Sequence, residues 1–170
     1  MGVAHTEWLA GDDSAAERVF REGLAVLEGI GERAYYPTAA LRFAALLYEH
    51  GRLDEVRYWY ERARETTGHD DFANFMLFDM LDGCLYAADG RHAEAEAAVS
   101  RVVERSEQTD FSELRIYAHR FVAEAFALMG RADEAREHAS RSLSIASIKG
   151  DVAFAARLRE RASALGIEVA

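Results

Sequence analysis

Apolar and polar residues recur along the chain in steps of three and four. Around Gly51, for example, Phe43 and Leu47 precede the glycine, and Val56 and Tyr60 follow it. This spacing is typical of helices that bury one face. The pattern predicts helices at residues 3–10, 13–29, 33–50, 53–67, 71–88, 92–106, 111–129, 132–147 and 152–164.

One short phrase occurs three times and divides the pattern into units. It stands as "GRLDEV" at 51–56, "GRHAEA" at 90–95 and "GRADEA" at 130–135. Together with Gly11, the three leading glycines are separated by 40, 39 and 40 residues. A constant period of this length indicates an internal repeat, so the chain is expected to be built of repeated two-helix units.

The phrase itself predicts a turn between two helices. Each glycine is expected to end a helix in the left-handed conformation, and the glutamate four residues later lies in the first turn of the next helix. A second set of breaks places an aspartate ahead of a new apolar face, in "TGHDDF" at 67–72, "EQTDF" at 107–111 and "KGDVAF" at 149–154. These aspartates are expected to act as N-caps.

Composition and charge narrow the range of possible binding partners. The chain contains 20 basic and 30 acidic residues, which gives a net charge of −10 and opposes binding to nucleic acid or to anionic membranes. It has neither a secretion signal nor an apolar run of membrane-spanning length, so a cytoplasmic location is expected. The single cysteine, Cys84, cannot form an internal disulfide.

The two-helix units resemble tetratricopeptide repeats. Small residues stand seven positions before the turn glycines and large ones four before, namely Ala44, Gly83 and Ala123, then Leu47, Tyr86 and Phe126. The tryptophan of the family is replaced by Ala40, Asp79 and His119, the closing proline is missing, and the period is longer than usual. This longer form is similar to the C-terminal helical arrays of actinobacterial signalling ATPases, cyclase-linked proteins and transcriptional activators.

The resemblance implies an all-α fold, a right-handed superhelix of stacked antiparallel helix pairs. We expect a single domain over 1–170, with a partial repeat at 1–30, repeats at 31–69, 70–108 and 109–149, and a capping helix at 150–170. Because the first unit begins mid-repeat, the chain is expected to be either a segment excised from a longer protein or a small array with a shortened cap, and we favour the former.

Three polar residues break the repeat and are the sharpest candidates for chemistry. Asp79 and Asp82 lie three positions apart on one helical face, and Asp79 and His119 both lie eleven before their turn glycines. An Asp79–His119 contact between neighbouring helices is therefore expected, as a structural pair or as part of a ligand site. No nucleophile, phosphate loop or metal-ligand spacing accompanies it, so we predict no catalytic residue, no metal and no cofactor.

Stacked helix pairs form a concave groove, and by the family's pattern its lining comes from the first helix of each pair. The candidates for partner binding are Tyr48, Leu77, Met80, Cys84, Tyr117, Arg120 and Glu124. The helix at 71–88 is apolar almost all round, which suggests that something covers it. The alternative is a narrow groove that the chain's own side chains close.

The sequence therefore favours a non-enzymatic module for protein–protein interaction. Such a module would bind a peptide, a helix or a second copy of the chain in its concave groove. Through its resemblance, it is expected to belong to a bacterial signalling or transcription-regulatory protein. The alternative is a sensor domain that binds a small molecule or a peptide pheromone.

Overall fold

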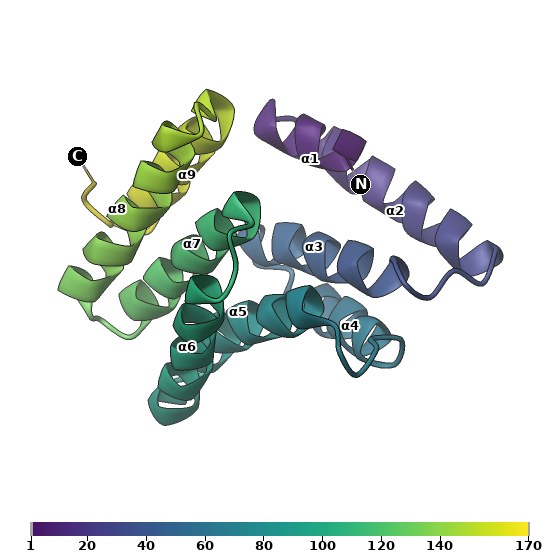
Figure 1. Ribbon diagram of the computed structural model, residues 1–170, viewed down its shortest axis with the longest axis horizontal. Helices are drawn as coiled ribbons and strands as arrows, with labels where there is room; N and C mark the ends of the chain where they lie inside the picture. The colour runs from purple at the N-terminus through teal and green to yellow at the C-terminus, as the bar shows by residue number, and fades with distance from the viewer. Residues whose placement is uncertain (1, 170) are drawn as a thin grey trace. The chain divides into compact units, whose positions relative to one another are not determined.

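A computed structural model describes residues 2–169, and within that range the chain forms nine helices and no strand (Figure 1). The expected all-α class is confirmed. The helices are α1 (Gly2–Leu9), α2 (Asp13–Gly29), α3 (Tyr36–Glu49), α4 (Leu53–Arg64), α5 (Phe72–Ala88), α6 (His92–Glu107), α7 (Ser112–Leu128), α8 (Ala132–Ile148) and α9 (Val152–Ala164).

The predicted helix ends agree with the structure to within three residues, and the two largest differences have local causes. Helix α3 begins later than expected because Pro37 occupies its first turn and the Glu32 carboxylate accepts the preceding backbone N–H groups. Helix α4 ends earlier because the hydroxyls of Thr66 and Thr67 donate to the carbonyl of Ala63 and close its last turn.

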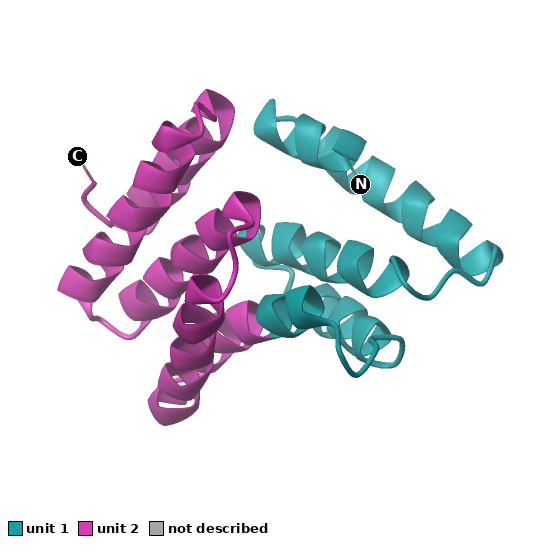
Figure 2. Cartoon of the chain, in the orientation of Figure 1, with its two compact units in different colours: residues 1–78 teal, residues 79–170 magenta. Residues whose placement is uncertain are grey.

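The chain divides into two compact units, residues 1–78 and residues 79–170 (Figure 2). In unit 1, α1 packs on α2, α2 on α3, and α3 on α4. In unit 2, α6 packs on α7, α7 on α8, and α8 on α9. The division falls inside α5.

The repeated phrase forms the expected turn at all three places. Gly51, Gly90 and Gly130 have φ angles of 68°, 74° and 75°, the left-handed conformation that favours glycine. At the third turn the N–H of Arg131 donates to the carbonyl of Phe126 at 2.9 Å, which satisfies a carbonyl at the helix end. The interpretation of the phrase as a helix-stop signal is confirmed.

Two of the three predicted aspartate caps are confirmed. The carboxylates of Asp71 and Asp151 each accept the backbone N–H three residues later, both at 3.0 Å. The prediction for Asp110 is wrong, because the N-cap of α7 is Phe111 and makes no side-chain cap bond. Instead, the Thr109 hydroxyl accepts the N–H of Phe111 at 3.1 Å.

Aromatic side chains organise the core of each unit. In unit 1 the buried Phe43 ring stacks on Phe20 of α2, with ring centroids 5.4 Å apart, and also contacts Trp59 of α4. In unit 2 the buried Phe154 ring of α9 contacts Tyr117 of α7 at 5.1 Å. None of the helices in the described range has the length and apolar character needed to cross a membrane.

Candidate functional site

The residues expected to line an open groove are almost all buried. Tyr117 is half-buried, and the other six are buried, namely Tyr48, Leu77, Met80, Cys84, Arg120 and Glu124. The Cys84 thiol also donates to the carbonyl of Phe121 at 3.4 Å. The structure therefore differs from the expectation that Leu77, Met80 and Cys84 present an uncovered apolar surface.

Arg120 and Glu124, expected to orient a partner, bind groups of their own unit. Arg120 Nε donates to one Glu124 carboxylate oxygen at 2.9 Å, and Arg161 Nη2 of α9 donates to the other at 2.7 Å. Glu124 is 1 % exposed, so its charge depends on these two guanidinium groups. The three residues tie α7 to α9 from within the core.

A small hollow lies beside this ion cluster. Its lining includes Arg120, Glu124, Ser142 and Arg161, and its volume is about 20 Å³. That volume holds about one water molecule. A metabolite does not fit there, and the hollow gives the sensor alternative no support.

Asp79 and His119 do not bind each other, contrary to expectation. Asp79 is buried and accepts from Arg101 Nε at 2.8 Å, and it also pairs with Arg105 on the same helix, α6. Asp82, predicted on the same face as Asp79, is half-buried. The Asp79 carboxylate is therefore held by two arginines, an arrangement that suits an ion pair and not a general base.

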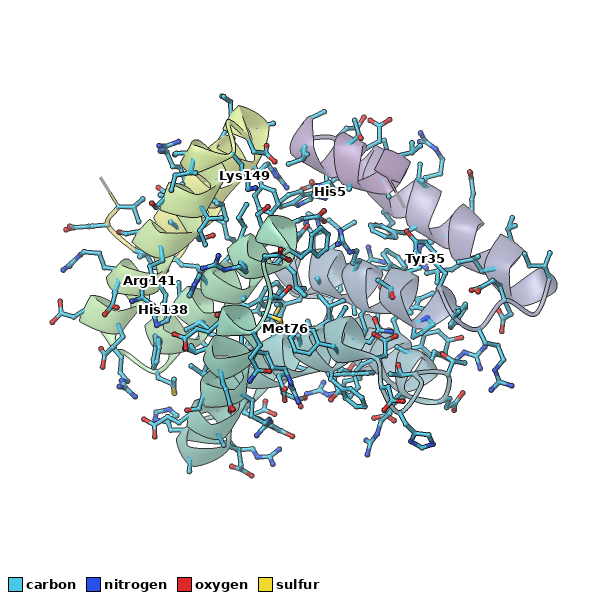
Figure 3. All side chains as sticks on the ribbon, in the orientation of Figure 1. His5, Tyr35, Met76, His138, Arg141 and Lys149 are labelled. Atoms are coloured by element: carbon cyan, nitrogen blue, oxygen red, sulfur yellow. The ribbon has the colours of Figure 1, made fainter. Side chains whose placement is uncertain are left out.

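His119 of α7 faces a second histidine instead. Its Nδ1 lies 3.0 Å from Nδ1 of His138 on α8, labelled in Figure 3, so one ring donates and the other accepts. Burial, followed by the neighbouring His138, lowers the pKa of His119 to about 4. Burial also lowers the pKa of His138. Both rings are neutral at pH 7.

Neither polar pair extends into a metal centre. Over residues 2–169, no group of three or more histidine, cysteine, aspartate or glutamate side chains is placed to hold a metal ion. The contacts of Asp79 join α5 to α6, and the His119–His138 pair joins α7 to α8.

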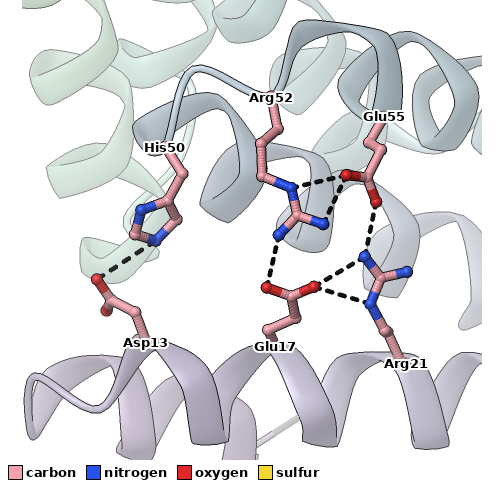
Figure 4. Close-up of polar contacts among 6 residues, drawn as sticks. All are labelled: Asp13, Glu17, Arg21, His50, Arg52 and Glu55. Carbon is pink, nitrogen blue, oxygen red and sulfur yellow. Dashed lines mark hydrogen bonds and ion pairs between the residues drawn. The ribbon is translucent and has the colours of Figure 1, made fainter.

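The arginine of the repeated phrase forms an ion cluster in unit 1 (Figure 4). Arg52 donates to Glu55 in the first turn of its own helix and to Glu17 of α2 at 2.7 Å. Arg21 bridges the same two carboxylates. The hydrogen bond from Arg52 is the main reason why the pKa of Glu17 lies below its usual value.

The same contacts recur in unit 2. Arg131 donates to Glu134 in the first turn of α8 and to Glu96 of α6, and its guanidinium lies 4.6 Å from the centre of the Phe126 ring. Glu17 and Glu96 both stand six residues after a turn glycine. In each unit one arginine of the repeated phrase, Arg52 or Arg131, therefore joins the preceding second helix to the turn, which is a structural role.

Unit 1 has an accessible, mostly apolar groove on α2, and the sequence alone did not predict it. The groove has a volume of about 390 Å³ and is lined by Ala4 of α1, by Val19, Phe20, Glu22, Gly23, Leu24, Val26 and Leu27 of α2, and by Tyr35 and Ala39. Val26 is 62 % exposed, and Tyr35, labelled in Figure 3, is 50 % exposed. We call this feature the α2 groove.

Comparisons with known proteins add no relative to this picture. No family model, no curated protein and no solved structure matches the chain. The functional interpretation therefore depends on the residues themselves.

Register carried a signal for one contact that the sequence interpretation missed. His119 lies eleven residues before Gly130 and His138 eight after it, so the two are at similar distances from one turn and face each other across the helix pair.

Proposed function

We propose that the chain is a helical-repeat module that binds a protein partner and carries out no catalysis. The observation that carries this proposal is the contrast between its polar and apolar candidates. Asp79, His119, Arg120 and Glu124 are engaged inside their units, whereas the α2 groove is apolar and accessible. An accessible apolar groove of this kind is typical of a docking surface.

We further propose that the two-helix units stack as in tetratricopeptide proteins, in a right-handed superhelix. The 40-residue period and the three identical turns support this proposal. So does the arginine that links a second helix to the following turn in both units. A bacterial signalling or regulatory protein is the setting in which such an array would act.

The burial of the earlier groove candidates changes how the proposal is tested. Met80 is 2 % exposed and Leu77 is 6 % exposed, so glutamate at either position would place a charge in the core and unfold the protein. Variants for binding studies therefore belong on accessible apolar residues, of which Val26 is the most suitable.

Quantitative affinity capture from the source cells, followed by reconstitution with the purified candidate, tests the function. We expect one protein to bind wild-type chain at a fixed stoichiometry and to raise its melting temperature. A metabolite that raises the melting temperature in the absence of any protein partner would favour the sensor alternative and contradict the proposal.

A further inference from the structure

An arginine stands at the same place in all three repeats, eleven residues after the turn glycine. The three are Arg62, Arg101 and Arg141. Arg62 pairs with Glu28 and Glu65. Arg101 Nε donates to Asp79 at 2.8 Å. Among the described residues, the ion-pair partner of Arg141 is Glu137 of its own helix, at 3.6 Å and with both side chains more than half exposed. This ion pair is the longest and the most exposed of the set, so it contributes the least.

The residue near this arginine differs between two successive helix pairs. Asp79 and His119 both stand eleven residues before their turn glycines, so His119 takes in the α7–α8 pair the place of Asp79 in the α5–α6 pair. The charge of Arg141 acts at that place, because it adds to burial and to His138 in lowering the pKa of His119. Arg101 therefore has a carboxylate at this position, whereas Arg141 has a neutral imidazole.

A second arginine belongs to the same cluster. Arg115 precedes His119 by one turn of α7, and Arg141 follows His138 by one turn of α8. The contact between the two histidines brings these helix faces together. Arg115 is half-buried, pairs with no carboxylate of the described residues, and has no hydrogen-bond partner for its Nε among them. We call Arg115, Arg141 and His138 the α7–α8 basic cluster.

We propose that the α7–α8 basic cluster binds a phosphate group at the surface between the two helices. The site goes beyond the proposed function, because it lies in unit 2 and specifies a ligand chemistry that the α2 groove does not. Two guanidinium groups match the charge of a phosphate and supply donors to its oxygens. The site is accessible at Arg141, whose side chain is 52 % exposed. His138 adds a ring N–H when its Nδ1 accepts from His119.

The charges around the cluster favour a phosphate over a carboxylate. The Asp79 carboxylate is held in place by its own helix, but a ligand outside the chain gains only from the contacts that it makes. A phosphate offers three acceptor oxygens and up to two negative charges to the two arginines. Glu137 competes for Arg141, while Glu134 accepts from Arg131 at 2.9 Å. Two charge-assisted contacts, opposed by Glu137, correspond to a dissociation constant on the order of 1 mM.

An NMR titration of the full chain with inorganic phosphate tests the site. Sodium chloride keeps the ionic strength constant at pH 7, and the imidazole signals of His119 and His138, assigned with single variants, report binding. We expect both signals to shift saturably, with a dissociation constant on the order of 1 mM. The signal of His69, an exposed histidine of unit 1, should not shift.

Substitutions in the cluster should change the affinity in opposite directions. Arg141→Gln and Arg115→Gln should each weaken phosphate binding about tenfold, because each removes one charge-assisted contact. The matched control is Arg136→Gln on the same helix, where the arginine is 49 % exposed and pairs with Asp133, and it should change the affinity by no more than about twofold. Glu137→Gln should strengthen binding, because it removes the competing carboxylate. Circular dichroism melting verifies that every variant is folded.

Phosphate shifts that do not saturate, or equal affinity in wild type and Arg141→Gln, would overturn the inference. Acetate that binds as tightly as phosphate would overturn the ligand class. These criteria do not depend on the capture of a protein partner, so the proposed function and this site fail separately.

A captured partner distinguishes the two sources of the phosphate. If phosphatase treatment of the partner and Arg141→Gln both weaken its binding, the phosphate belongs to a phosphorylated residue of that protein. If neither does, while Arg141→Gln still weakens the binding of inorganic phosphate, the ligand is the free ion.

Discussion

At the scale of single residues, the polar side chains that break the repeat, Asp79 and His119, make contacts inside their own unit. The His119–His138 pair shows the consequence. The buried His119 ring and the half-buried His138 ring share one hydrogen bond. Burial penalises the charged form of His119, so its protonation opposes folding, and stability depends on pH in a range where ordinary carboxylates are already charged.

The pair predicts a loss of stability in mild acid. The pKa of His119 falls from 6.5 to about 4 on folding, so the unfolded chain binds more protons between these values. The stability from this residue is complete above pH 6.5 and is lost as the pH falls toward 4. Between pH 7.5 and 5 we expect a loss of about 2 kcal/mol from His119.

Urea unfolding at the two pH values measures this loss. His119→Leu should reduce the pH-dependent difference by about 2 kcal/mol, whereas His69→Leu, at an exposed histidine, should leave it unchanged. The charged groups that influence the pair are Arg115, Arg141, Glu134 and Glu137. An unchanged pH dependence in His119→Leu would contradict the assignment.

Two glycines in different backbone conformations give a second prediction, because alanine should have opposite effects on stability at the two positions. Gly130→Ala should destabilise the protein by about 1 to 2 kcal/mol, because alanine at φ 75° is strained. Gly23→Ala should stabilise it by about 0.5 to 1 kcal/mol, because that glycine lies inside a helix with open space around it. Thermal unfolding followed by circular dichroism compares them, and shifts in the same direction would contradict this account.

At the scale of helices, ion pairs join elements that are distant in sequence. Glu124 of α7 accepts from Arg161 of α9 and from Arg120 of its own helix. The Glu124 carboxylate is almost completely buried, so its removal would take away the carboxylate with which the buried Arg120 and the half-buried Arg161 both pair.

Glu124→Leu is therefore expected to destabilise the protein by about 3 to 5 kcal/mol. Urea unfolding measures the change. A matched control is Glu137→Leu, at an exposed glutamate of α8, which should alter stability only slightly. A loss of less than about 1 kcal/mol in Glu124→Leu would show that the cluster contributes little.

Helix positions and turns could be predicted from the sequence because both depend on local signals. The breaks at glycine and aspartate and the three- and four-residue spacing were sufficient to place α2 and α9 at their observed bounds. The side-chain partners of Asp79 could not be predicted, since Arg101 and Arg105 compete with His119 and sequence spacing does not rank them. Long arginine side chains reach carboxylates that short imidazoles do not.

At the scale of the whole molecule, the burial of the groove candidates could not be predicted either. Register places Leu77, Met80 and Cys84 on one helix face, but whether that face is covered depends on how the rest of the chain folds. The α2 groove was missed for a related reason. Its lining joins residues of α1 and α2 with Tyr35 and Ala39, and register alone does not say how these segments pack.

Hydrogen–deuterium exchange of the chain alone tests the central claim, that the second half of α2 lies uncovered. Residues 23–29 of α2 and 142–148 of α8 both end a second helix, so fraying is matched between them. We predict much faster amide exchange in α2, because α8 is covered along this length by α7. Equal protection of the two segments would contradict the account.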